Sequence, residues 1–173
     1  MHFIERCFAI FAVLALLAPQ PGCAQANKSA EDADQKELYS YVLTADKLHQ
    51  LADATRDIKE LQKKNPQAAD EKVDTASEEG SISQRVKDIE AKAPEFAAIV
   101  RKNGLTPREY LVALLVLMQA SILVSMKKAS NTEYSKEATT LVSPANLAFV
   151  EQHWDDLQKM NLGADSKDAD DKN

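Results

Sequence analysis

Residues 110–126 form a segment so apolar that it limits what the rest of the chain can fold into. Its sequence, YLVALLVLMQASILVSM, holds fourteen apolar residues in seventeen. A helix that is apolar on every face must be surrounded by protein or by lipid. Seventeen helical residues reach about 25 Å, somewhat short of the ~30 Å hydrocarbon core of a bilayer. We therefore expect a helix enclosed by other helices of the same chain.

Local signals indicate where this central helix begins and ends. Thr106 is suited to be the N-cap, Pro107 to be the first helical residue, and Glu109 to complete a capping box with Thr106. Lys127 and Lys128 favour the negative C-terminal end of a helix. The pattern predicts a helix over 107–128. In the alternative, this helix inserts into a membrane with the two lysines on the cytoplasmic side.

The remaining segments predict an all-α fold, an irregular bundle of about five helices around the central one. Apolar residues at helical spacing follow the N-cap Thr44 and the possible capping box at Ser81. Pro94 and the pair Ser143-Pro144 are further start signals, and Asn103-Gly104 ends the helix before the central one. We expect an N-terminal lead-in over 27–43, a helical domain over 44–163 with a polar loop over 65–80, and a disordered acidic tail over 164–173.

The N-terminus predicts export. Residues 7–18, CFAIFAVLALLA, are a twelve-residue apolar run that follows Arg6. The triplet Ala24-Gln25-Ala26 suits signal peptidase and would make residues 1–26 the signal peptide. In a competing interpretation Gly22-Cys23 ends a lipoprotein box, and Cys23 is lipidated and becomes the first residue. Either route leads to the periplasm, the cell exterior or the lipid surface of the bacterial envelope.

Composition and motifs argue against several function classes. The formal net charge is −6, without a long basic run, so nucleic acid is not expected as a partner. The two cysteines lie at positions 7 and 23, so the exported part has no pair that could form an internal disulfide. No nucleophile elbow, phosphate-binding loop or dinucleotide motif occurs. We therefore expect a protein that is not an enzyme and uses no cofactor.

A few residues are candidates for a metal or ligand site. His49 has Asp53 four residues on, and His153 has Asp156 three residues on, so a zinc or copper site would need the two helices to meet. A pocket for a small apolar ligand would lie beside the central helix. Its candidate lining residues are Gln119, Ser121, Tyr110 and Trp154.

The buried helix faces also suggest a structural role for one polar residue. Asn146 lies one turn into the last helix, where asparagine is a poor helix former. We expect its amide to bond to a neighbouring loop and hold that helix in place.

Three stretches carry a resemblance: LTADKL at 43–48, GLTPREYLVALLVLMQA at 104–120 and SPANLAFVEQH at 143–153. Together they resemble a loosely defined group of uncharacterised exported helical proteins from Gram-negative bacteria. The resemblance implies a helical fold and an exported location, and it implies no activity and no site residues.

The sequence thus predicts an exported, non-catalytic helical protein of the bacterial envelope that acts by binding a partner. The expected surface is whatever apolar area the helices leave uncovered, near Tyr39, Tyr41 and Tyr134. The alternatives are a small-molecule carrier with a pocket beside the central helix and a membrane-associated lipoprotein anchored through Cys23.

Overall fold

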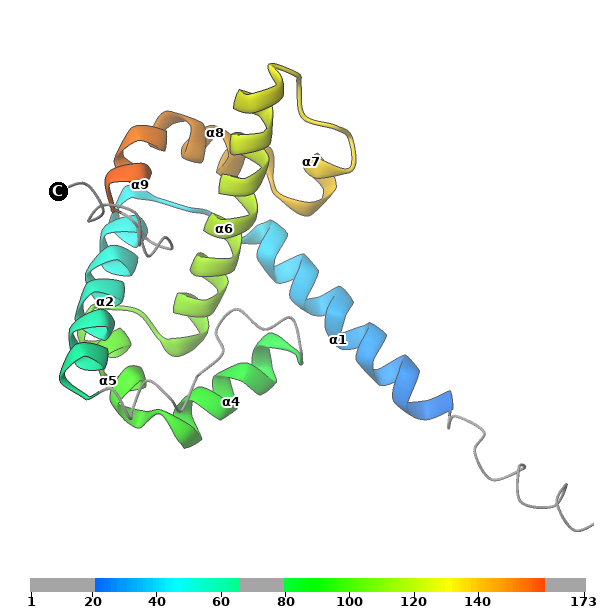
Figure 1. Ribbon diagram of the computed structural model, residues 1–173. Helices are drawn as coiled ribbons and strands as arrows, with labels where there is room; N and C mark the ends of the chain where they lie inside the picture. The colour runs from blue at the N-terminus through cyan, green and yellow to red at the C-terminus, as the bar shows by residue number, and fades with distance from the viewer. Residues whose placement is uncertain (1–20, 66–79, 161–173) are drawn as a thin grey trace, which may run out of the picture.

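The computed structural model describes residues 21–65 and 80–160, with side chains from residue 29 onward, and every regular element in these ranges is an α-helix. The elements are α1 (Pro21–Ser40), α2 (Ala45–Lys64), α4 (Ile82–Lys92), α5 (Pro94–Lys102), α6 (Pro107–Ser130), α7 (Ala138–Leu141), α8 (Pro144–Gln152) and α9 (Trp154–Met160) (Figure 1). The prediction of an all-α fold is confirmed.

Four of the eight helices in the described ranges begin where the local sequence provides a side-chain cap. Thr44 and Ser81 each accept a hydrogen bond from the backbone amide three residues on, and Ser143 does the same for Asn146. The Thr106–Glu109 capping box has both of its reciprocal bonds. Gly104 has the positive φ of +83° expected just after a helix. These predicted starts and stops are confirmed.

Helix α6 lies in the middle of the fold and packs against α1, α2, α4, α5 and α8 (Figure 1). Most of its buried residues belong to a core that also includes Leu51, Val100 and Val150, all fully buried. A second, smaller cluster joins Leu111 of α6 to Ile89 and Ala97, and it lies under α4 and α5. Each buried large aliphatic side chain contributes about 1.5–3 kcal/mol of hydrophobic free energy, before conformational entropy is subtracted.

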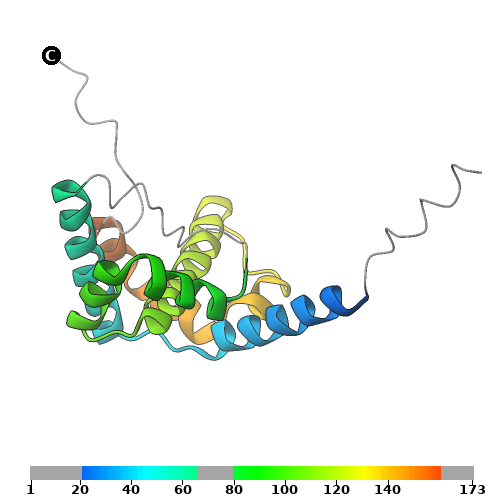
Figure 2. The same ribbon diagram turned by 90° about the horizontal axis from the view of Figure 1, so that it is seen from below.

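The N-terminal segment differs from the predicted lead-in, because it forms a full helix. Helix α1 projects away from the other helices in both views (Figures 1 and 2), and only its C-terminal part packs against them. There Arg108 of α6 makes a two-bond contact with the Glu37 carboxylate, at 2.8 and 2.6 Å. The Asp34 carboxylate accepts a hydrogen bond from the Ile82 amide at 2.7 Å, so a residue of α1 caps the N-terminus of α4. These contacts tie α1 to two helices that follow it by more than forty residues.

Two further differences concern the C-terminal third. Helix α6 continues two residues past its predicted end at 128, and a connection and the short α7 follow it before Ser143. The last predicted helix is divided in two at His153, where α8 ends and α9 begins. Three predicted features lie wholly or mainly outside the described residues: the apolar run of the signal peptide, most of the 65–80 loop and the tail 164–173.

Candidate functional site: an open apolar face on helix α6

One face of α6 remains exposed over the C-terminal half of the helix. At about 100° per residue, positions 111, 115, 118, 122, 126 and 129 fall on one side of the helix. Leu111 is fully buried, whereas Met118, Ile122 and Met126 are 41%, 56% and 62% exposed. We call the exposed stretch the open face and define it by Leu115, Met118, Ile122, Ser125, Met126 and Ala129.

This face changes from buried to exposed along the helix because α4 and α5 cover only its N-terminal part. At Leu111 the face is covered by Ile89 of α4 and Ala97 of α5, with Phe96 packed alongside. Figure 1 shows that α4 and α5 lie level with the N-terminal half of α6, while its C-terminal half extends past them. The opposite side of that half packs against α8, which buries Ala120 and Val124. The expectation that helices enclose α6 on all sides is therefore wrong for its C-terminal half.

The chemistry of the open face is uniform. No charged residue occurs between Glu109 and Lys127, so the face offers only aliphatic, thioether and hydroxyl groups. Methionine side chains are flexible and polarizable, and they adapt to differently shaped apolar partners. A continuous apolar stripe of this kind on a folded surface is a feature of sites where proteins, membranes or ligands dock.

Helix α6 also has the length and composition of a membrane-spanning helix. Its 24 residues include an 18-residue window of mean hydropathy 1.9, of which 44% is buried inside the protein. The buried part is the side that packs against α2, α4, α5 and α8. The same helix thus supplies both part of the core of this fold and an exposed apolar surface.

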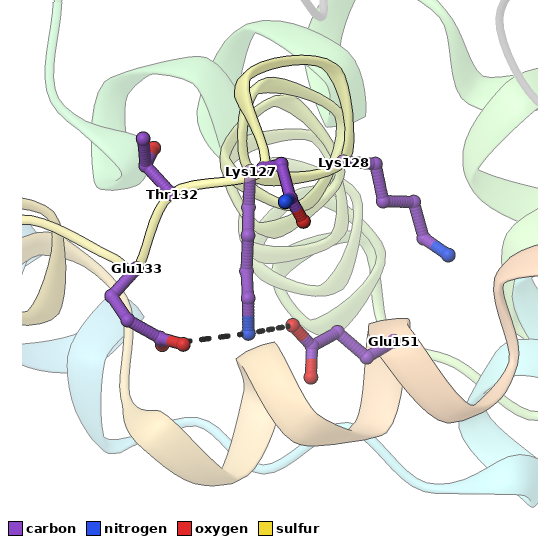
Figure 3. A pocket seen from close by; sticks show the side chains of 6 residues that line it. Lys127, Lys128, Thr132, Glu133 and Glu151 are labelled. Carbon is purple, nitrogen blue, oxygen red and sulfur yellow. Dashed lines mark hydrogen bonds and ion pairs between the residues drawn. The ribbon is translucent and has the colours of Figure 1, made fainter.

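A polar cluster lies at the C-terminal end of α6 (Figure 3). The Lys127 ammonium donates to the Glu151 carboxylate of α8 at 2.8 Å and lies 3.8 Å from a Glu133 oxygen. The Tyr134 hydroxyl donates to the same Glu151 oxygen at 2.6 Å, and Lys127 lies 4.6 Å from the Tyr134 ring centre. These contacts fasten the end of α6 and the connection after it to α8.

The ionisation of the cluster follows from its contacts. The bond to Glu151 raises the pKa of Lys127, and the bond from Lys127 lowers the pKa of Glu151. Burial raises the pKa of the Tyr134 hydroxyl well above its usual range, and its bond to Glu151 adds to this effect. At neutral pH the cluster therefore holds the Lys127 ammonium, the Glu151 carboxylate and a protonated Tyr134 phenol.

An open hollow of about 310 Å³ lies beside this cluster. It is lined by Lys127, Lys128, Asn131, Thr132, Glu133 and Glu151, so cationic and anionic groups balance around it. Lys128 lies over the Trp154 ring at 5.6 Å, and Figure 3 shows it pointing away from the Lys127–Glu151 pair. None of the residues that define the open face lines this hollow. Most of its charged groups form ion pairs with one another.

Neither of two hollows among the described residues is lined by the predicted ligand-site residues. Tyr110 is buried in the core, edge-on to Phe96 at 5.4 Å, with its hydroxyl 3.4 Å from Thr55. Gln119 and Ser121 lie on α6 on either side of the open face, and Trp154 begins α9. None of these four candidates lines the hollow beside Lys127 or a smaller one, of about 180 Å³, between α2 and Met160.

The metal-ligand candidates also have other contacts. Asp53 pairs with Arg56 at 2.8 Å, Asp156 pairs with Lys159 at 3.3 Å, and the His153 ring packs on Phe149 at 4.4 Å. His49 is exposed on α2. Among residues 29–65 and 80–160, no three His, Cys, Asp or Glu side chains lie close enough to hold an ion.

The binding surface that the sequence predicts does not coincide with the open face. Of the three tyrosines expected near a binding surface, Tyr39 is exposed, while Tyr41 and Tyr134 are half-buried. No sequence signal marks Ile122 or Met126 as exposed, because α6 is apolar on every side and its periodicity marks no outer face. Comparison with protein-family models, with characterised proteins and with solved structures gave no match.

Proposed function

We propose that this chain is an exported, non-catalytic helical protein of the bacterial envelope, built as an irregular bundle around α6, that acts by binding another protein molecule through the open face. The observation that carries the proposal is the exposure of Met118, Ile122 and Met126 on one side of a helix whose opposite side is buried against α8. Burying such side chains is worth about 1.5–3 kcal/mol each when they become fully covered.

A protein partner is favoured over the other occupants by charge and shape. The chain carries a formal net charge of −6, which opposes approach to an anionic lipid surface. A small-molecule carrier needs a concave site that surrounds most of its ligand, whereas the open face is one side of a helix. A helix surface is well suited to pack against another helix, as α4 and α8 do on other parts of α6.

The signal peptide supports an exported location, and its fate is tested by the mass of the mature protein. A mature chain that begins at Asn27 supports cleavage after Ala26. A diacylated chain that begins at Cys23 supports the lipoprotein route. An intact Met1 in the purified protein would overturn export altogether.

The binding surface is tested by photo-crosslinking in living cells. A photoreactive amino acid replaces Met118, Ile122 or Met126, and a fourth variant carries it at Leu141 of α7, which is 50% exposed and apolar but lies outside the open face. We expect one protein adduct of the same mass from all three open-face positions and none from Leu141. Equal labelling at Leu141, or no protein adduct at the three positions, would overturn the proposal.

A further inference from the structure

We propose that the occupant of the open face is a second copy of this chain, packed antiparallel so that the two Ile122 residues meet at a two-fold axis; this rests on the proposed function. An interface between identical subunits requires one patch that is complementary to itself. The open face meets this requirement in its charge. It has no charged residue, so two copies bring no like charges into contact there.

The spacing of the side chains makes the open face complementary to itself in shape as well. Met118 and Met126 lie four residues on either side of Ile122, about 6 Å along the helix axis in each direction. In an antiparallel pair centred on Ile122, each Met118 is level with the second copy's Met126. Leu115 and Ala129 lie seven residues on either side of Ile122. In the pair, Leu115 of each copy is therefore level with Ala129 of the other, a large side chain opposite a small one.

The ends of the open face select the antiparallel direction. Helix α6 ends at Ser130, and Asn131 turns the chain with a φ of 52°. In the antiparallel pair the Ser130 end of one copy lies level with Leu114 of the other copy. Leu114 lies three residues past Leu111, which α4 and α5 cover. A parallel pair would instead bring the α4–α5 cover of one copy level with that of the other, so both covers would lie at the same end of the interface.

The size of the face predicts a weak dimer. A stable interface buries about 800 Å² on each partner, and one stripe of three exposed side chains covers a few hundred. The two copies also repel through their equal net charges, a repulsion that salt screens. We expect a dimer that forms with increasing protein concentration and is strengthened by salt.

The first test is sedimentation of the exported protein over a range of concentrations. The wild type should shift from monomer to dimer. Ile122→Asp should raise the dimer dissociation constant at least about tenfold, because a carboxylate would be buried at the axis. Leu141→Asp on α7 is the matched control and should leave the dissociation constant unchanged. Circular dichroism of each variant shows whether the helices are retained.

Cysteine pairing then tests the register in a Cys23→Ser background. Ile122→Cys should form a disulfide with itself on mild oxidation. Leu115→Cys should not pair with itself and should pair when mixed with Ala129→Cys. Self-pairing of Leu115→Cys would overturn the antiparallel register.

A wild type that stays monomeric at every concentration would overturn the inference, and photo-crosslinking at Ile122 then separates the two proposals. An adduct whose mass matches a different protein would retain the proposed function while the second copy is rejected. Absence of any protein adduct would reject both. A dimer that Ile122→Asp and Leu141→Asp leave equally intact would show that the copies associate elsewhere, and it would also overturn the inference.

Discussion

The side-chain amide of Asn146 holds the backbone of Leu43, 103 residues away in the chain. Its oxygen accepts a hydrogen bond from the Leu43 amide at 2.9 Å, and its nitrogen donates to the Tyr41 carbonyl at 2.8 Å. Asn146 is only 1% exposed and is the one polar residue among the buried side chains of the described ranges. The extended link between α1 and α2 is thereby fixed to α8, as the sequence predicted for this residue in outline.

Replacing Asn146 by Ala should destabilise the fold by about 2–4 kcal/mol, because the Leu43 amide and the Tyr41 carbonyl lose their partner near the core. Urea denaturation followed by circular dichroism measures the loss. Gln158→Ala, at an exposed position of α9, is the control and should change stability by less than about 0.5 kcal/mol. A loss for Asn146→Ala as small as that of the control would mean that water replaces both bonds without cost.

The two halves of one face of α6 should respond differently to truncation. Leu111→Ala removes a fully buried side chain between α4, α5 and α6 and should cost about 2–5 kcal/mol. Met118→Ala, two turns later on the same face, should cost less than about 1 kcal/mol in the dilute monomer because Met118 is 41% exposed. The measurement is thermal or urea unfolding at low protein concentration, and similar costs at both positions would contradict an open face.

The Thr106–Glu109 capping box should make stability depend on pH in the acidic range. The Thr106 amide and then Lys47 lower the pKa of Glu109 by hydrogen bonding to its carboxylate. The stabilisation is present above the unfolded-state pKa of about 4.3 and is lost as the pH falls through the lower folded-state pKa. Glu109→Gln should therefore be less stable than wild type at pH 7 and no longer so near pH 2.

Denaturation midpoints of the two proteins at both pH values provide this comparison. Thr106→Ala should cost about 1 kcal/mol at neutral pH through loss of the cap. A difference between wild type and Glu109→Gln that persisted in acid would point to a cause other than the ionised carboxylate.

The cluster at the end of α6 gives a prediction at alkaline pH. Glu151→Gln should lower the pKa of Tyr134, because the negative acceptor of its hydroxyl is lost while burial still keeps that pKa raised. Ultraviolet absorbance of tyrosinate, with Tyr134→Phe subtracted in each background, follows this one phenol. Glu133→Gln, whose side chain is 91% exposed, is the matched control and should shift the titration less.

The fold and the candidate site differed in how far the sequence could predict them. The starts of α2, α4, α6 and α8 depend on hydrogen bonds between residues three positions apart, so the sequence alone indicates them. Helix α1 has no such signal, because the groups that position it, the Arg108 guanidinium and the Ile82 amide, come from α6 and α4. The division of the last helix at His153 likewise has no proline or glycine to mark it.

The sequence by itself determined that this chain is helical, that its most apolar helix begins at the Thr106 cap, and that Asn146 would need a buried partner. Those properties depend on the order of neighbouring residues and on the requirement that buried polar groups be paired. Which side of α6 is left exposed is set by the packing of the other helices. That outcome depends on how far α4 and α5 extend along α6, and a helix that is apolar on every side contains no information about the lengths of the helices that cover it.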